Sequence, residues 1–389
     1  MAGRRRTNKK SEGESPVAGL GERKNLSPIT HFLSTGCTIL DLAITDDLPG
    51  GFPGGRITHI YGLESAAKTI FATEPLGSAQ RQGGKAFFED AEHTLDFDRL
   101  ELFGVDCGAD PLEDKKNWCY GTPNSIEELF DVEIQSAIDD CDNKKPNAMA
   151  VDSLSALSSE KELEAKLTDA SYGTSRAKKM SEAFRKFLRL LSEANLALIF
   201  VDQSRQGLDP YGPKEVVSGG LALKFYSSVR IHMAVEKRIY EREKGPVVGV
   251  WFKFEVVKNK VGPPLRAGRV AVIFNYGVDD IRTNIEFLKT TGEGTEFATL
   301  ACKECPHTIQ VKKETRATKK KCPKCGGVLR KLRGGGGYEF CNQSFKSMAA
   351  AIEWVEKNEA DEILAKEVRE HWRLMHQTQE RKLKPRRRN

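Results

Sequence analysis

The sequence lacks any long apolar segment. No run approaches the roughly 20 apolar residues that a membrane-spanning helix needs, and the basic residues 1–10 are not followed by the apolar stretch of a secretory signal. Nine cysteines are an odd number for a disulfide framework, and five of them stand singly. We therefore expect no membrane partner and a reducing, cytoplasmic location.

The sequence also has only a small net charge. Its 389 residues carry a net charge of only +6, with 30% charged and 39% hydrophobic residues. This size and composition are typical of one large core with small appendages. The positive charge gathers in residues 1–10, among the later cysteines and in residues 381–388, which suits nucleic acid, although solvated tails look the same and that alternative stays open.

Apolar runs alternate with helical periodicity in the middle of the chain, which predicts an α/β fold with a mostly parallel sheet covered on both faces. Four short apolar runs are predicted parallel strands: residues 56–61, 85–88, 148–151 and 196–201. Helical spacing marks residues 126–138 and 180–191. Three later runs predict an antiparallel extension of the sheet: residues 229–235, 247–257 and 269–276.

Changes in composition divide the chain into four segments. The order is a flexible basic arm, a large α/β core, a cysteine module and a charged, periodic segment that we expect to be helical with a basic tail. The predicted boundaries are residues 1–30, 31–295, 296–333 and 338–389.

A phosphate loop follows the first predicted strand directly and precedes a helical segment, the context that distinguishes such a loop from a chance match. Its backbone N–H groups are expected to wrap a phosphate, with a lysine on the β- and γ-phosphates and a threonine hydroxyl on Mg²⁺. The loop comprises Gly62, Leu63, Glu64, Ser65, Ala66, Ala67, Lys68 and Thr69.

Two residues depart from the usual pattern of a phosphate loop. Ala67 stands where a second glycine is usual, and if the backbone there has positive φ, its methyl group costs about 1 kcal/mol. Pro75 lies in the following helix and is expected to kink or shorten it. A generic strand–turn–helix or a decayed site is the alternative interpretation of this motif.

Carboxylates follow two other predicted strands. Asp152 ends the strand at 148–151 and is placed to hold Mg²⁺ beside Thr69. The acidic residues 89–92 follow the strand at 85–88, where a carboxylate could activate water for attack on a γ-phosphate. Each is weak alone, since acidic turns are usually solvated surface.

Several segments in order resemble the RecA family of strand-exchange ATPases, over residues 33–278. They are the approach at 33–36, 40–41 and 54–57, the loop at 62–69, and the segments 91–96, 151–157, 200–205, 219–226 and 256–260. The resemblance implies that Glu92 is catalytic, that Asp96 contacts adenine, that Gln203 senses the γ-phosphate, and that Lys258 and Lys260 reach a neighbouring protomer's nucleotide.

The resemblance also implies two DNA-binding loops, at about residues 166–173 and 204–220. The expected DNA contacts in and beside them are Lys166, Tyr172, Arg176, Arg205, Tyr211, Gly219 and Gly220. Two features differ from the family: the amino-terminal docking helix is shortened or replaced by the basic arm, and Arg99 stands near the position where an aromatic stacks on adenine. A diverged member, encoded by a bacterium or a phage, fits these differences.

The predicted function is that of an ATP-dependent recombinase that pairs single-stranded DNA with a homologous duplex. ATP and Mg²⁺ are its expected cofactors, and self-assembly into a filament or ring is expected. Two alternatives remain: a branch-migration motor resembling the RadA family, suggested by residues 258–262 and the cysteine module, and a non-hydrolysing mediator that binds nucleotide and DNA.

Two C-x-x-C pairs predict a structural zinc site. Cys302 with Cys305, and Cys322 with Cys325, have the spacing of a tetrathiolate ribbon, and two redox-active pairs are the alternative. Lysines and arginines between the pairs suit DNA phosphates or keep the ribbon soluble. The other five cysteines are expected to pack as small apolar residues: Cys37, Cys107, Cys119, Cys141 and Cys341.

Overall fold

A computed structural model gives the architecture of the chain. It describes residues 29–112, 117–164, 173–206, 215–217, 220–242, 244–294, 297–302, 304–305, 308–312, 321–331, 337–341 and 343–377. Among these residues, no helix combines the length and apolar character needed to cross a bilayer.

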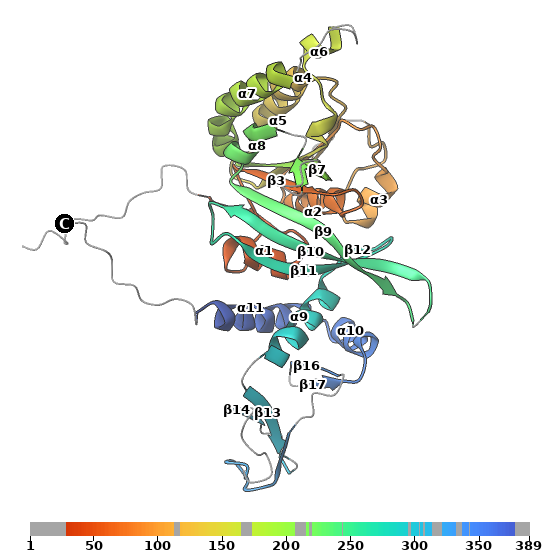
Figure 1. Cartoon of the computed structure of the whole chain (residues 1–389), viewed down its shortest axis with the longest axis vertical. Helices are drawn as coiled ribbons and strands as arrows, with labels where there is room; N and C mark the ends of the chain where they lie inside the picture. The colour runs from red at the N-terminus through yellow and green to blue at the C-terminus, as the bar shows by residue number, and fades with distance from the viewer. Residues whose placement is uncertain are drawn as a thin grey trace, which may run out of the picture.

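A ten-stranded sheet forms the centre of the molecule, in the order β12-β11-β10-β9-β3-β7-β6-β4-β5 with β8 paired to β7 (Figure 1). Its parallel half contains the four strands predicted from apolar runs and one more. They are β3 (Ile57–Gly62), β4 (Ala86–Asp90), β5 (Trp118–Gly121), β6 (Asn147–Asp152) and β7 (Leu196–Gln206). Strand β5 was not predicted, because four residues show too little periodicity.

The other half of the sheet is antiparallel, as predicted. It consists of β9 (Val229–Tyr240), β10 (Val247–Asn259), β11 (Arg266–Ile273) and β12 (Gly277–Asp279). The two halves join because β9 runs parallel to β3. The predicted α/β class is therefore correct: one half of the sheet is parallel, and the other half extends it with antiparallel strands.

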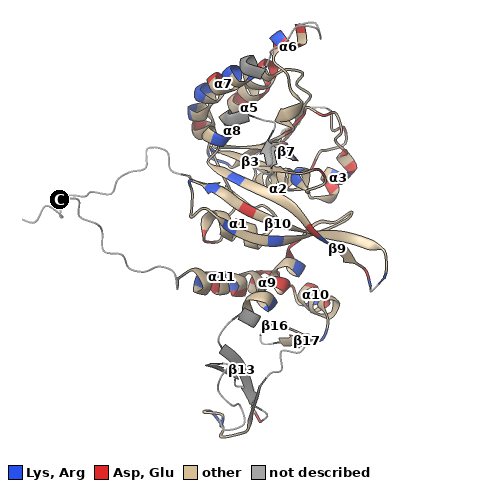
Figure 2. Ribbon diagram, viewed as in Figure 1, with Lys and Arg blue, Asp and Glu red and all other residues tan. Residues whose placement is uncertain are grey.

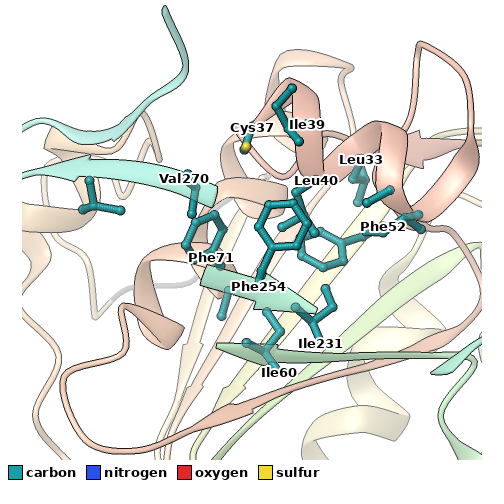
Figure 3. Close-up of a cluster of buried hydrophobic side chains, with 14 of the residues drawn as sticks. Leu33, Cys37, Ile39, Leu40, Phe52, Ile60, Phe71, Ile231, Phe254 and Val270 are labelled. Atoms are coloured by element: carbon teal, nitrogen blue, oxygen red, sulfur yellow. The ribbon is translucent and has the colours of Figure 1, made fainter. Parts of the chain in front are cut away.

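Helices cover both faces of the sheet. On one face, α1 (Thr38–Thr45) and α2 (Lys68–Arg81) share an apolar core with β9, β10 and β11. Figure 3 shows this core, where Phe71, Phe254 and Val270 meet. The opposite face is covered by α4 (Ile126–Glu128), the π-helical turn η1 (Leu129–Ile134), α5 (Gln135–Asp140) and α7 (Gly173–Ala194).

Short elements complete the core. They are β1 (Phe32–Leu33), β2 (Phe52–Pro53), α3 (Phe97–Leu102), η2 (Leu154–Ala156), α6 (Glu160–Glu164), β8 (Glu215–Val217) and α8 (Gly220–Tyr226). Strands β1 and β2 pair in antiparallel fashion.

Pro75 does not shorten the helix that contains it. Helix α2 continues through it to Arg81, because a proline removes one N–H donor and so frees one carbonyl, while the buried side chains on either side still pack. Phe71 and Leu76 are fully buried on this helix. Tertiary packing therefore outweighs the local penalty.

The carboxyl-terminal elements include a second, smaller sheet. After α9 (Asp280–Gly294) come β13 (Phe297–Cys302), β14 (Thr308–Lys312) and β15 (Leu329–Lys331), which form a three-stranded antiparallel sheet. Figure 1 shows β13 and β14 at the end of the molecule farthest from α7. The last elements are β16 (Tyr338–Phe340), β17 (Gln343–Phe345), α10 (Met348–Lys357) and α11 (Asp361–Gln377).

Helix α11 packs back onto the core. The indole of Trp372 is buried, and its Nε1 donates a hydrogen bond to Oδ1 of Asp46 at 3.0 Å. The guanidinium of Arg266 pairs with Asp46 and lies 5.3 Å from the Trp372 ring. Val368 and Leu364 join the same apolar core as α1 and α9. The described part of the last segment is thus continuous with the core.

Candidate functional site

The loop between β3 and α2 has the backbone of a phosphate cradle. Ser65 and Ala67 both have positive φ, at 57° and 55°, which curls the chain and turns successive N–H groups toward one side. Ala67 is the N-cap of α2 and offers no side-chain cap, so the amino-terminal N–H groups of this helix are available to an anion. The left-handed conformation considered for Ala67 is present.

Lys68 lies over the loop. Its Nζ donates a hydrogen bond to the carbonyl oxygen of Leu63 at 2.8 Å, and its side chain is mostly buried. Burial lowers the pKa of Lys68, and nearby carboxylates, of which Asp152 and Glu92 act most strongly, oppose that shift. The ammonium group therefore lies among acidic side chains at the position where phosphate charge would be compensated.

Thr69 and Asp152 meet, as the sequence predicted. The Thr69 hydroxyl donates a short hydrogen bond to Oδ2 of Asp152, at the carboxyl end of β6. Burial raises the pKa of Asp152 to about 6, because the carboxylate is poorly solvated. A hydroxyl beside a carboxylate is an oxygen donor set that suits Mg²⁺, and a bound cation would compensate the buried charge.

Glu92 is held beside this pair. Strands β4 and β6 are neighbours, with Asp90 opposite Asp152, so the turn after β4 reaches the end of β6. The hydroxyl of Ser153 donates a hydrogen bond to Oε1 of Glu92 at 2.6 Å. Ser153 in turn contacts the hydroxyl of Ser155 at 2.8 Å. The carboxylate predicted to be catalytic is thus oriented by a residue that sequence reasoning did not select.

Gln203 lies level with the start of the phosphate loop. In the parallel pairing of β3 with β7, Gln203 is opposite Gly62. Strand β7 continues three residues further, to Gln206. The residue therefore lies where a strand passes from the nucleotide side of the sheet into the segment predicted to bind DNA.

Lys258 lies near the end of strand β10, and Lys260 follows directly after that strand. Nζ of Lys258 donates hydrogen bonds to the carbonyls of Lys224 and Phe225 at 2.7 and 2.9 Å. Burial, then the charges of Lys260 and Arg230, lower the pKa of Lys258 to about 8. The side chain of Lys260 is exposed. Lys260 is thus open to solvent, whereas the half-buried Lys258 is bonded to the end of α8.

Comparison with known proteins identifies the family. The family profile described as the RecA N-terminal domain matches residues 5–279. Protein RecA of Nostoc sp. is 35% identical over 288 residues, which cover 73% of this chain and 74% of that protein. The chain belongs to the RecA family. Protein RecA of Synechocystis sp. is 36% identical over 283 residues (71% and 73%), and that of Macrococcus caseolyticus is 34% identical over 293 (73% and 76%).

Within this RecA fold, few of the predicted DNA contacts can be placed. Lys166, Tyr172, Tyr211 and Gly219 lie outside the described residues. The other three lie close to the segment after β6, near the carboxyl end of β7 and at the start of α8. Arg176, near the start of α7, donates a hydrogen bond to the carbonyl of Leu154 at 2.8 Å, the exposed Arg205 lies on β7 opposite Val216, and Gly220 begins α8.

Charges of both signs mark the outer surface near these residues. Figure 2 shows blue and red bands along α7, and its sequence carries more lysine and arginine than acid. The net positive charge of this helix is compatible with a polyanion nearby.

Asp96 and Arg99, which lie in the region predicted to contact adenine, contact each other. Asp96 is the N-cap of α3, where its side chain accepts a hydrogen bond from the backbone N–H of Arg99 at 3.4 Å. The side chains of both residues are exposed, and Nε of Arg99 lies 3.8 Å from Oδ2 of Asp96. Adenine contact by either residue stays a prediction.

Three of the four predicted zinc ligands lie together. The Sγ atoms of Cys305, Cys322 and Cys325 are all within 4.8 Å of one another, and the first two are 3.6 Å apart. The turn is closed by N–H donation from Gly326 to the carbonyl of Cys322 at 2.8 Å. Cys302 ends β13, and its side chain lies outside the described residues. Converging thiols of this kind fit a soft metal such as Zn²⁺.

The remaining cysteines pack as expected for small residues. Cys37 and Cys107 are buried, and Cys119, Cys141 and Cys341 are half-buried. Burial is the main reason that the pKa values of Cys141 and Cys341 rise to about 12, which keeps these thiols protonated.

Sequence reasoning missed a group of buried polar residues beneath the site. His59, Asp202 and Arg230 come from three adjacent strands and are almost inaccessible. His59, Asp202 and Arg230 share one face of the sheet, because side chains alternate between its two faces along each strand. A titratable residue in or directly after each of three predicted strands was the signal that could have found them.

Proposed function

We propose that this chain hydrolyses ATP in a DNA-dependent manner and acts as a recombinase, binding single-stranded DNA and pairing it with a homologous duplex in repair. The observation that carries the proposal is the meeting of Lys68, Thr69, Asp152 and Glu92 around one loop. These groups come from three separate segments and match the needs of phosphoryl transfer. Membership of the RecA family supports the same activity.

Each side chain has a distinct task in this proposal. The loop N–H groups hold the phosphates, and Lys68 exchanges its bond to the Leu63 carbonyl for one to the γ-phosphate. Glu92, oriented by Ser153, accepts a proton from the attacking water. Thr69 and Asp152 would hold Mg²⁺, which supplies charge compensation to the phosphate oxygens.

Assembly is the proposed route by which Lys258 and Lys260 act. Both groups lie near the surface, and a lysine supplied to a neighbouring protomer would stabilise transition-state charge as an arginine finger does. We therefore propose self-association into a filament or ring on DNA. We further propose that the protein works in the cytoplasm of a bacterium or phage-infected cell.

ATP turnover with and without single-stranded DNA tests the proposal. We expect DNA to stimulate turnover strongly, and Glu92→Gln and Lys68→Ala to abolish it. Asp98→Asn, an exposed change of the same kind nearby, is the matched control and should leave turnover unchanged. No turnover in the intact protein would favour the mediator, and unwinding of branched DNA without strand exchange would favour the branch-migration motor.

We also propose that the cysteine cluster binds Zn²⁺ as a structural site, with Cys302 as the fourth ligand. Support comes from the convergence of Cys305, Cys322 and Cys325 and from the C-x-x-C spacing that places Cys302 three residues before Cys305. A three-stranded sheet as short as β13–β15 is expected to need such a link for its stability.

A further inference from the structure

A chain of buried polar contacts runs across β7, β3 and β9 under the candidate site. Nε2 of His59 lies 3.0 Å from Oδ2 of Asp202, and Nε of Arg230 donates a hydrogen bond to Nδ1 of His59 at 3.2 Å. The exposed fractions of His59, Asp202 and Arg230 are 1%, 0% and 9%. Burying a carboxylate, an imidazole and a guanidinium together is costly unless they compensate one another.

The contacts define which nitrogen of the His59 imidazole carries the proton. A guanidinium N–H can only donate, so Nδ1 of His59 must accept, and a neutral His59 carries its proton on Nε2, facing Asp202. Burial lowers the pKa of His59 despite the opposing effect of Asp202, which agrees with the neutral form. Among the described residues, Nε2 of His59 and both carboxylate oxygens of Asp202 lack a partner with hydrogen-bond geometry. The 3.0 Å approach of Nε2 to Oδ2 of Asp202 is therefore a close polar contact between two buried groups.

Each end of this chain adjoins a functional candidate. Asp202 immediately precedes Gln203, and its charge acts on the ammonium of Lys68. Arg230, at the other end, lowers the pKa of Lys258 through its charge. The ring of Tyr61 lies between, 4.6 Å from the Arg230 guanidinium and stacked on His59 at 5.2 Å. The strands that carry the nucleotide loop and the γ-phosphate glutamine are therefore tied by side chains as well as by backbone.

We propose that His59, Asp202 and Arg230 are positioning residues that fix the end of β7, and with it Gln203, relative to the phosphate loop. The inference rests on the proposed ATP-dependent function. Backbone pairing sets Gln203 opposite Gly62, whereas the contact from His59 to the adjacent Asp202 restrains the twist of β7 just before the strand leaves the sheet. A displacement of about 1 Å at such a position can cost about 100-fold in rate.

A matched pair of substitutions separates positioning from simple packing. His59→Phe keeps a ring that can stack on Tyr61 and removes both nitrogens, while His59→Gln keeps one donor and one acceptor. The readout is the ratio of affinities for ATPγS and ADP in the presence of single-stranded DNA, since only ATPγS carries a γ-phosphate for Gln203 to sense.

We expect His59→Phe to lower this affinity ratio, and the kcat for ATP, by at least about 10-fold, with ADP affinity within about 3-fold of wild type. His59→Gln should restore both. An unchanged ratio in His59→Phe, or equal loss of both nucleotides, would overturn the inference, as would a wild-type protein that does not discriminate between the nucleotides. If His59→Phe does not fold, Asp202→Asn, which keeps the side-chain size, is expected to lower the same ratio, and an unchanged ratio there would also overturn it.

Failure of the proposed function has a different signature. A wild-type protein that binds ATPγS more tightly than ADP but does not hydrolyse ATP would contradict the ATPase, and the affinity ratio of the two His59 variants would still decide the positioning role.

Discussion

The hydroxyl of Thr69 donates a hydrogen bond to Oδ2 of Asp152, joining the first turn of α2 to the end of β6 across 83 positions of sequence. Because both oxygens suit Mg²⁺, we expect Thr69→Val to lower ATP turnover about 100-fold, the size of effect seen when one transition-state contact is lost. Titration of turnover with Mg²⁺ measures this. Thr69→Ser keeps the hydroxyl and should retain most activity, and equal losses in both variants would contradict the assignment.

Ala67 should limit the stability of the phosphate loop. Its φ of 55° puts a residue with a side chain in the left-handed region of backbone space. We therefore expect Ala67→Gly to raise the free energy of unfolding by up to about 1 kcal/mol. Ala66, the adjacent alanine, is not among the residues with positive φ. Ala66→Gly should therefore lower the free energy of unfolding by a similar amount. Denaturant unfolding without nucleotide compares the two. A loss of stability in Ala67→Gly would show that the methyl contact with the core outweighs the strain.

Lys258 should make ATP turnover depend on pH. Its pKa is lowered to about 8, mainly by burial, and a lysine is charged below its pKa and neutral above it. If its charge is needed in the assembled protein, turnover falls as pH rises from 7 to 9. Lys258→Arg keeps its charge throughout this range, so we expect the variant to lose this pH dependence in steady-state assays. The same decline in both proteins would assign it to another group.

The cysteine cluster should hold one metal ion per chain. Cys322→Ser is expected to release zinc and to increase protease cleavage between residues 296 and 333, because the small sheet depends on the link. Cys341→Ser, outside the cluster, should keep the metal. Metal analysis and the thiolate-to-metal charge-transfer absorption of a Co²⁺-substituted protein measure binding. Full metal content in Cys322→Ser would refute the tetrathiolate site.

Much of the candidate nucleotide site could be predicted because its residues follow strands. Apolar runs located β3, β4, β6 and β7, and the carboxyl ends of parallel strands meet at one edge of the sheet. Lys68, Thr69 and Asp152 therefore converge as expected. Glu92 required the family resemblance, since an acidic turn alone does not reveal which neighbour orients it.

Other contacts could not be predicted because they join distant elements. Trp372 and Asp46 are 326 positions apart, and the amphipathic pattern of α11 shows that one face is buried without showing which surface covers it. The ion pairs from Arg369 and Arg373 to Asp47 also join α11 to a distant segment and could not be predicted for the same reason. The shortening expected at Pro75 does not occur, because the buried neighbours outweigh the local propensity on which it rested, whereas a kink at Pro75 stays a prediction.

Helix α9 and strand β16 lie in contact, with Nζ of Lys289 4.5 Å from the ring of Tyr338. The chain therefore leaves the core after Gly294 and returns to it at nearly the same place. In evolutionary terms, residues 295–337 resemble a cassette inserted into a surface connection, which a lineage could gain, lose or exchange without rebuilding the core around it. A protein engineer could use the same junction to graft a different module onto an unchanged core.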